Sequence, residues 1–116
     1  METFEDKKTY AVYSEFGLSS EAGKYKLSAK GYSGDAGDQL IKHNDQMFAA
    51  DDADNDSHST YCCACSHRGG WWFIDCYNAN LNGKYYYKHD TFPSNPVGIY
   101  WSGLATSFRY VAMKLH

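Results

Sequence analysis

The segment from Phe48 to Gly83 constrains this chain more than any other. It reads FAADDADNDSHSTYCCACSHRGGWWFIDCYNANLNG: an acidic run, three clustered cysteines, a Trp pair, a fourth cysteine and an Asn-Gly turn. The four cysteines allow three complete pairings, and their spacing alone does not select one. This segment holds most of the residue types that can bind a metal or a ligand.

The acidic run has the composition of a site for a hard cation. Asp52, Asp54 and Asp56 alternate with Ala53 and Asn55, so several oxygens can turn toward one point. Calcium takes about six to eight oxygen ligands from carboxylates, carbonyls and water. The residues that follow, 57–60, are placed to supply carbonyls. A solvated acidic turn is the alternative for an isolated D-x-D-x-D pattern.

An EF-hand is excluded by spacing. With Asp52 as position 1 of such a loop, position 6 is Ser57 rather than Gly, and position 12 is Cys63 rather than Glu. The EF-hand needs Gly for its sharp turn and Glu as a bidentate ligand.

Composition indicates a globular chain that does not bind nucleic acid. Its 116 residues are 43% hydrophobic, and the net charge of −3 leaves no basic stripe for a phosphate backbone. Aromatic residues make up 17%, including eleven Tyr, which suit both β-rich packing and recognition surfaces. The first eight residues contain no signal-peptide apolar region, and no run approaches the roughly 20 apolar residues of a membrane span.

Periodicity predicts a mixed α+β unit that begins with a hairpin. Thr9–Phe16 and Lys24–Lys30 alternate with the strand period and are joined by the turn at 17–23. The second strand is expected to place Tyr25, Leu27 and Ala29 on one face and Lys24, Lys26, Ser28 and Lys30 on the other.

Three further elements are expected downstream. Asp35–Lys42 is predicted to form one or two helical turns, capped by Asp35 or Asp38. We expect Asp51–Ser66 to be an irregular loop and Ser107–Leu115 to be the final strand.

The order of the motifs resembles the C-terminal part of the fibrinogen-related domain, which is found in fibrinogen chains, ficolins, tachylectins, angiopoietins and tenascins. YSGDAGD, WWxxxC and NLNG are each distinctive, and the resemblance covers nearly the whole chain. The matching pieces are AVYSEF (11–16), YKLSAKGYSGDAGD (25–38), HNDQMF (43–48), DADND (52–56), CA (63–64), GGWWF (69–73), Cys76, NLNGKYY (80–86), GIYW (98–101) and SFRYVAMKL (107–115).

The resemblance implies an α+β fold: a short antiparallel sheet with a loop-rich calcium- and ligand-binding subdomain. We expect one domain over 1–116, with 1–47 and 107–115 as the central-sheet part and 48–106 as the calcium- and ligand-binding part. The family's domain is about twice as long, so the chain resembles a fragment or a short member. An uncovered sheet edge invites pairing with another chain, which suggests a homo-oligomer.

The family pattern implies a calcium ion held by two carboxylates and two backbone carbonyls. These positions fall on Asp54 and Asp56 for the carboxylates, and on His58 and Thr60 for the carbonyls. The same pattern implies a disulfide between Cys63 and Cys76. One residue is inserted before Cys63, so Cys62–Cys76 is an alternative pairing. Cys62 and Cys65 would otherwise be free or joined to each other.

The resemblance also implies a ligand pocket beside the calcium loop, next to a cis peptide bond before Cys76. Lectin members of the family bind N-acetyl groups there. The expected pocket residues are His67, Cys76, Tyr77, Phe92 and Asn95. This chain departs from the lectin pattern at three positions: Tyr77 stands where His is frequent, and His67 and Thr106 stand where the family has Tyr. Altered specificity is therefore expected, and Tyr77 has packing in the core as its alternative role.

Two rival chemistries use the cysteines. Cys62, Cys65 and His67, with Cys76 or His58, offer zinc ligands, but a single C-x2-C pair is an incomplete zinc pattern. A cysteine–histidine nucleophile, Cys76 or Cys65 with His67 or His89, lacks any local signature of a thiol enzyme.

We therefore expect a secreted, non-enzymatic, calcium-dependent lectin for N-acetylated or related glycans in innate recognition. The alternative is a protein-binding module of the angiopoietin or fibrinogen type.

Overall fold

The computed structural model describes residues 1–55, 62–67, 69–87, 98–104 and 107–115. Its elements are short and are separated by long connections. In chain order they are strand β1 (Ala11–Leu18), 3-10 helix η1 (Glu21–Gly23), strand β2 (Leu27–Gly34), 3-10 helix η2 (Leu40–His43), helix α1 (Cys63–His67), strand β3 (Ala79–Asn80) and strand β4 (Tyr100–Trp101). The fold is a loop-rich α+β arrangement with two short antiparallel sheets, as the sequence predicts.

Strands β1 and β2 form the predicted hairpin, with Ala11 opposite Gly34 and Leu18 opposite Leu27. The second strand begins three residues later than expected, because Lys24 and Tyr25 both have positive φ and belong to the turn. Tyr25 is therefore exposed rather than buried beside Leu27 and Ala29, which corrects its predicted position.

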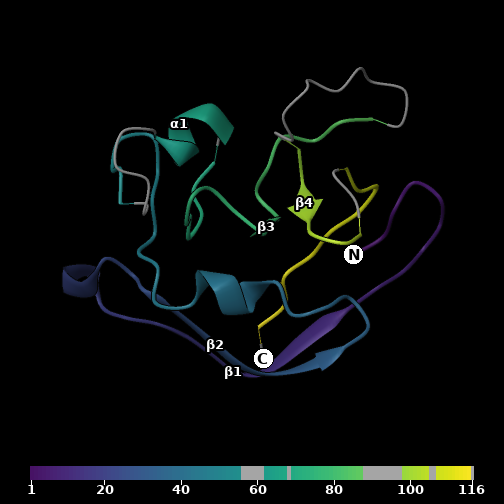
Figure 1. Cartoon of the computed structure of the whole chain (residues 1–116), viewed down its shortest axis with the longest axis horizontal. Coiled ribbons are helices and arrows are strands. Elements are labelled where there is room, and N and C mark those ends of the chain that lie inside the picture. Colours follow the sequence, from purple (N-terminus) through teal and green to yellow (C-terminus); the bar gives the residue numbers. More distant parts are fainter. Residues whose placement is uncertain (56–61, 68, 88–97, 105–106, 116) are drawn as a thin grey trace.

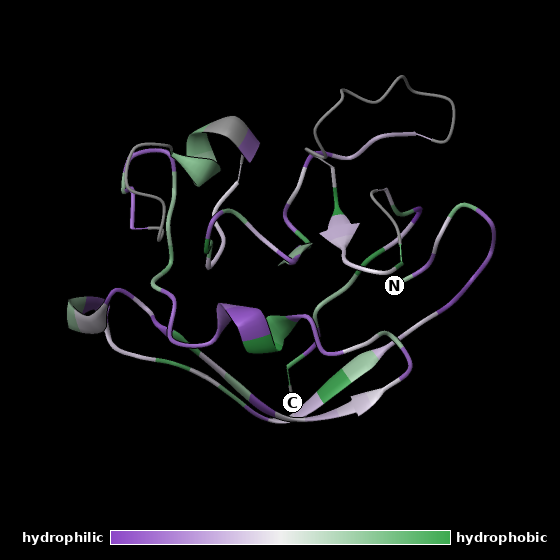
Figure 2. Cartoon of the chain, viewed as in Figure 1, coloured by the Kyte–Doolittle hydropathy of each residue, from purple (hydrophilic) through white to green (hydrophobic). Residues whose placement is uncertain are grey.

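The buried face of β2 changes at Gly31. Leu27 and Ala29 are buried, but beyond them the partly buried side chain is Tyr32, one position out of step with simple alternation. Gly31 has φ 70°, a conformation that suits glycine, and this resets the direction of the side chains that follow. Figure 2 shows apolar and polar residues mixed along this hairpin, without a strict alternation.

Helix η2 lies between the hairpin and the rest of the chain (Figure 1). The predicted helical turn is present but is displaced toward the end of the expected range, and its N-cap is Gln39 rather than Asp35 or Asp38. Asp35 instead accepts a hydrogen bond from the Tyr10 N–H. The carboxylate of Asp38 accepts a hydrogen bond from the Ile41 N–H at 3.2 Å and also from the Tyr13 hydroxyl at 2.7 Å. Asp38 thus ties the start of η2 to β1.

The segment after η2 runs along the start of β2. The Leu27 N–H donates to the Gln46 carbonyl, and the Asp45 N–H donates to the Leu27 carbonyl. The side-chain amide of Asn44 accepts from the Ala29 N–H and donates to the Ala29 carbonyl. These bonds fix residues 44–46, which precede the acidic run, relative to the hairpin.

Two predicted segments, the loop at 51–66 and the strand at 107–115, differ from the structure. Helix α1 occupies Cys63–His67, inside the predicted loop at 51–66; it is a single turn that buries Cys63 and Ala64. Among residues 107–115 the structure has no named strand: Tyr110 forms only an isolated bridge with Glu2, and the hairpin is not extended.

The core lies between the hairpin and the β3–β4 side of the molecule, on which α1 also lies (Figure 1). Large aromatic side chains from three separate segments meet in it, and each contributes about 2–3 kcal/mol by burial. The fully buried ones are Trp71, Phe73, Trp101 and Phe108. The Trp101 indole N–H donates to the carbonyls of Ala36 and Gly37, so β4 is anchored to the segment before η2.

Within the described part of the chain, no helix is long and apolar enough to cross a bilayer.

Candidate functional site

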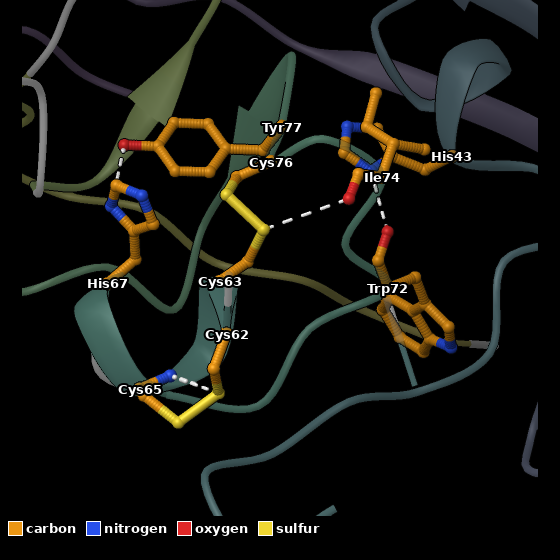
Figure 3. Close-up of a disulfide and its surroundings, with 9 residues drawn as sticks. All are labelled: His43, Cys62, Cys63, Cys65, His67, Trp72, Ile74, Cys76 and Tyr77. Atoms are coloured by element: carbon orange, nitrogen blue, oxygen red, sulfur yellow. Dashed lines mark hydrogen bonds between the residues drawn. A yellow bond between two sulfur atoms is a disulfide. The ribbon is translucent and has the colours of Figure 1, made fainter. Parts of the chain in front are cut away.

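The site is built around helix α1 and the two disulfides that begin on it (Figure 3). Cys63 is fully buried and is joined to Cys76, with a Cα–Cα distance of 5.5 Å. This confirms the pairing expected from the family pattern and rules out Cys62–Cys76. The bridge closes the segment that carries Trp71 and Trp72 onto α1.

The second disulfide joins Cys62 to Cys65, with a Cα–Cα distance of 5.2 Å. No cysteine is left as a free thiol. A zinc site and a thiol nucleophile both need thiolate sulfur. With all four cysteines in disulfides, the cysteine cluster offers neither a zinc ligand nor a nucleophile.

The peptide bond between Asp75 and Cys76 is cis, as the resemblance implies. The next side chain, Tyr77, is half-buried and begins a short connection to β3.

The His43 side chain is hydrogen-bonded to the backbone of this segment. Its Nδ1–H donates to the Trp72 carbonyl at 2.8 Å, while its Nε2 accepts from the N–H groups of Asn78 at 3.0 Å and Ala79 at 3.1 Å. Those bonds require the neutral imidazole with its proton on Nδ1. Burial lowers the pKa of His43, and the bond to the Trp72 carbonyl opposes that shift only in part. The imidazole therefore connects the chain on both sides of Cys76.

Four aromatic rings cluster beside the Cys63–Cys76 bridge. The rings of His67 and Tyr77 meet edge to face with centroids 4.8 Å apart, and the Tyr77 hydroxyl lies 3.4 Å from His67 Nδ1. The Tyr100 ring lies 5.2 Å from that of Tyr77. Phe73 forms the floor and is fully buried, with its centroid 6.3 Å from that of Tyr77. The other three side chains are only partly buried, so each keeps some surface exposed to solvent.

The structure therefore brings together three of the five predicted pocket residues: His67, Cys76 and Tyr77. Phe92, Asn95 and the departure at Thr106 lie outside the described residues. Sequence reasoning missed Tyr100 and His43 as site residues. Tyr100 lies in the GIYW motif and His43 begins the HNDQMF motif, both of which matched the family. Neither motif by itself shows which distant segment its residues contact in the fold.

The acidic loop lies on the other side of α1. Ala50 and Ala53 exchange backbone hydrogen bonds across a tight turn. The Asp51 carbonyl at its tip lies 3.7 Å from Cys65 Sγ. Helix α1 thus touches the acidic loop through Cys65 and the aromatic cluster through His67.

Among the described residues, no group of three or more His, Cys, Asp or Glu side chains converges as a metal site, so the described part of this loop does not form one by itself. The Asp54 side chain is exposed and takes part in no ion pair within the described residues. Asn55 is tied down instead: its amide donates to the Phe48 carbonyl and accepts from Lys24 Nζ, each at 3.1 Å. Asp56, His58 and Thr60 lie outside the described residues, so their predicted role as ligands stays a prediction.

Comparison with known proteins identifies this arrangement. The family model described as the fibrinogen beta and gamma chains, C-terminal globular domain, matches residues 1–116. Techylectin-5A of Tachypleus tridentatus is 37% identical over 112 residues, which cover 96% of this chain and 38% of that protein.

Two solved structures show the same fold. The fibrinogen-like globe domain of human ANGPTL2 superposes with a TM-score of 0.82 at 38% identity, covering 94% of this chain and 48% of that one. Lamprey fibrin D-dimer, complexed with the peptide Gly-His-Arg-Pro-amide, gives a TM-score of 0.81 at 27% identity over 92% of this chain and 39% of that one. The chain spans less than half the length of each relative, and it belongs to the family of fibrinogen C-terminal globular domains.

Proposed function

We propose that this chain is a calcium-supported recognition module that binds N-acetylated or related glycans without chemical turnover. The observation that carries the proposal is the partly exposed cluster of His67, Tyr77 and Tyr100, set on the disulfide-closed segment after the cis peptide bond. Aromatic walls suit an acetyl methyl group or the apolar face of a sugar, and a few fixed polar groups orient its oxygens.

Calcium would be held by the carboxylates of Asp54 and Asp56 and by the carbonyls of His58 and Thr60. When bound, the ion would supply positive charge and order in the acidic loop. The Asp54 carboxylate, which is exposed and forms no ion pair with the residues that the structure describes, and the anchoring of Asn55 support this assignment. Few carboxylates on a surface loop favour weak binding, with a Kd of about 10⁻⁴–10⁻³ M, in the range of extracellular modules.

The pocket would extend from His67 and Tyr77 toward Phe92 and Asn95, with the backbone amides of Cys76 and Tyr77 as donors to the ligand. The mutual contact of His67 and Tyr77 supports a shared wall. Because the two residues depart from the lectin pattern, we expect weaker or altered sugar selectivity.

Relatedness to techylectin-5A, whose name denotes a lectin, favours glycan binding. The peptide in the lamprey fibrin complex favours the alternative, a protein-binding module that uses the same family surface. Two disulfides suit an oxidising compartment, so we propose a secreted protein for either function.

Removal of the Tyr77 ring tests the pocket. Tyr77→Ala should weaken binding of immobilised N-acetylated sugars at least about tenfold, since an anchoring aromatic contact is worth 1.4 kcal/mol or more. Tyr10→Ala is the matched control, because Tyr10 is 57% exposed, immediately before β1, and its loss should leave binding unchanged. Equal binding by wild type and Tyr77→Ala would place recognition elsewhere on the molecule.

A further inference from the structure

The two disulfides of α1 differ in their surroundings. Cys63 is completely buried, and its partner Cys76 is packed against the core. Cys65 is exposed, and Cys62 is only partly buried. Figure 3 shows the two bridges leaving adjacent positions of the chain: one passes to the Cys76 segment, and the other returns to α1 itself.

The two bridges also differ in what they hold together. Cys63 and Cys76 are 13 residues apart, and the loop between them carries the buried residues Trp71 and Phe73. Cys62 and Cys65 are three residues apart and enclose little more than one turn. A shorter loop constrains the unfolded chain less, so opening the second bridge removes less stability.

We propose that Cys62–Cys65 is a thiol–disulfide exchange site for dithiol reductants, small or protein-borne, while Cys63–Cys76 remains closed. Access to sulfur and the stability of the leaving thiolate set the rate of such exchange. Because Cys65 is exposed, a reductant can reach its sulfur. The backbone N–H of Cys65 stabilises the leaving thiolate, because it points to Cys62 Sγ at 3.2 Å and favours negative charge on that sulfur.

The exchange proceeds in two steps. A thiolate of the dithiol attacks Cys65 Sγ, the Cys62–Cys65 bond breaks, and Cys62 leaves as a thiolate that takes a proton from water. The second thiolate of the dithiol then attacks its own sulfur in the mixed disulfide, which releases Cys65 as a thiolate that is protonated in turn. The protein pair gains two electrons and two protons, and the dithiol becomes a disulfide.

Reduction of the Cys62–Cys65 disulfide should change the contact between Cys65 and the acidic loop. In the oxidised state, Cys65 Sγ lies 3.7 Å from the Asp51 carbonyl and has no proton to donate. After reduction, the Cys65 thiol gains an S–H that can donate to this carbonyl. The turn from Ala50 to Ala53 is therefore the part of the fold that should respond to the redox state.

Graded reduction of the folded protein tests the proposal. The protein is exposed to rising dithiothreitol concentrations, alkylated, and mapped by mass spectrometry, while tryptophan fluorescence reports the native core. Cys62 and Cys65 should be alkylated at a dithiothreitol concentration at least about tenfold below that needed for Cys63 and Cys76, with native fluorescence retained.

A variant with Cys62→Ser and Cys65→Ser is the matched control. It should keep the native fluorescence and lose the early alkylation. The proposal is overturned if Cys63 or Cys76 is alkylated first, or if all four thiols appear only together with loss of the native fluorescence. Mapping of the wild type decides between these outcomes even if the variant does not fold.

Discussion

His43 is a polar side chain that links several parts of the described core. It is fully buried, and it holds the backbone on both sides of Cys76 through three hydrogen bonds. Protonation at Nε2 would replace an acceptor by a donor facing two N–H groups. The neutral form is therefore required for the site geometry.

This requirement predicts a stability that depends on pH. Burial lowers the pKa of His43 in the folded state. Above the unfolded value, near 6.5, both states are neutral and the free energy of unfolding is unaffected. As pH falls below about 6.5 the unfolded state takes up the proton first, so stability falls, by up to about 1 kcal/mol between pH 6.5 and 5.5. Urea denaturation at several pH values measures this loss.

His43→Gln is the control for that prediction. Glutamine keeps a donor and an acceptor but does not titrate in this range, so the variant should be less stable overall and should show a smaller fall with acid. An equal fall in both proteins would assign the acid sensitivity to other groups.

At the scale of elements, close approach of backbones determines where glycine is needed. A Cβ at Gly83 would overlap the carbonyl of Gly98, beside the bridge that Lys84 forms with Gly98. The NLNG motif is thus tied to the segment that leads into β4. Gly17 in β1 has open space around its missing side chain.

Gly83→Ala should therefore lower the free energy of unfolding by about 1–3 kcal/mol, the usual cost of overpacking. Gly17→Ala changes the same atoms without a clash and should leave stability within about 0.5 kcal/mol or raise it slightly. Denaturant melts of both variants provide the comparison. A Gly83→Ala protein as stable as Gly17→Ala would show that the two backbones can separate without cost.

Local patterns predicted the elements that rest on local physics. The presence of the hairpin and the Asp38 interaction with the start of η2 follow from neighbouring residues. The turn was predicted too short, at 17–23, because the positive φ of Lys24 and Tyr25 has no signal in the strand period. Helix α1 was missed because five residues give too short a period, and its stability comes from burying Cys63 and Ala64. The disulfide between Cys63 and Cys76 followed from family resemblance, since spacing alone allowed three pairings. The contact between Tyr77 and Tyr100 joins segments that no local pattern connects.

At the scale of the whole molecule, the β1–β2 hairpin presents exposed apolar side chains and, within the described residues, an unpaired outer edge on β1, whereas the start of β2 is hydrogen-bonded to residues 44–46. Val12 is 50% exposed and Leu18 is 49% exposed on β1, and in the described residues the sheet has only two strands. Open edges of this kind template pairing with a second chain.

The isolated chain is therefore expected to self-associate through β1. Sedimentation velocity should show a concentration-dependent shift toward dimer, and Val12→Lys should shift the equilibrium toward monomer, because a lysine on an edge strand opposes pairing. Lys30→Gln, at an exposed position of β2 away from the open β1 edge, is the control and should leave the equilibrium unchanged. A wild type that stays monomeric at all concentrations would contradict this expectation.

The central claim is calcium-dependent recognition, and a glycan array run with calcium and then with a chelator tests it most directly. Wild type should bind N-acetylated glycans in millimolar calcium, and the chelator should abolish that binding. Asp54→Asn with Asp56→Asn should fail to bind even in calcium. Asp52→Asn, an exposed carboxylate of the same loop outside the proposed ligand set, should bind as wild type does. Glycan binding that survives chelation would contradict the calcium role, and the absence of binding to any glycan would transfer the function to a protein partner.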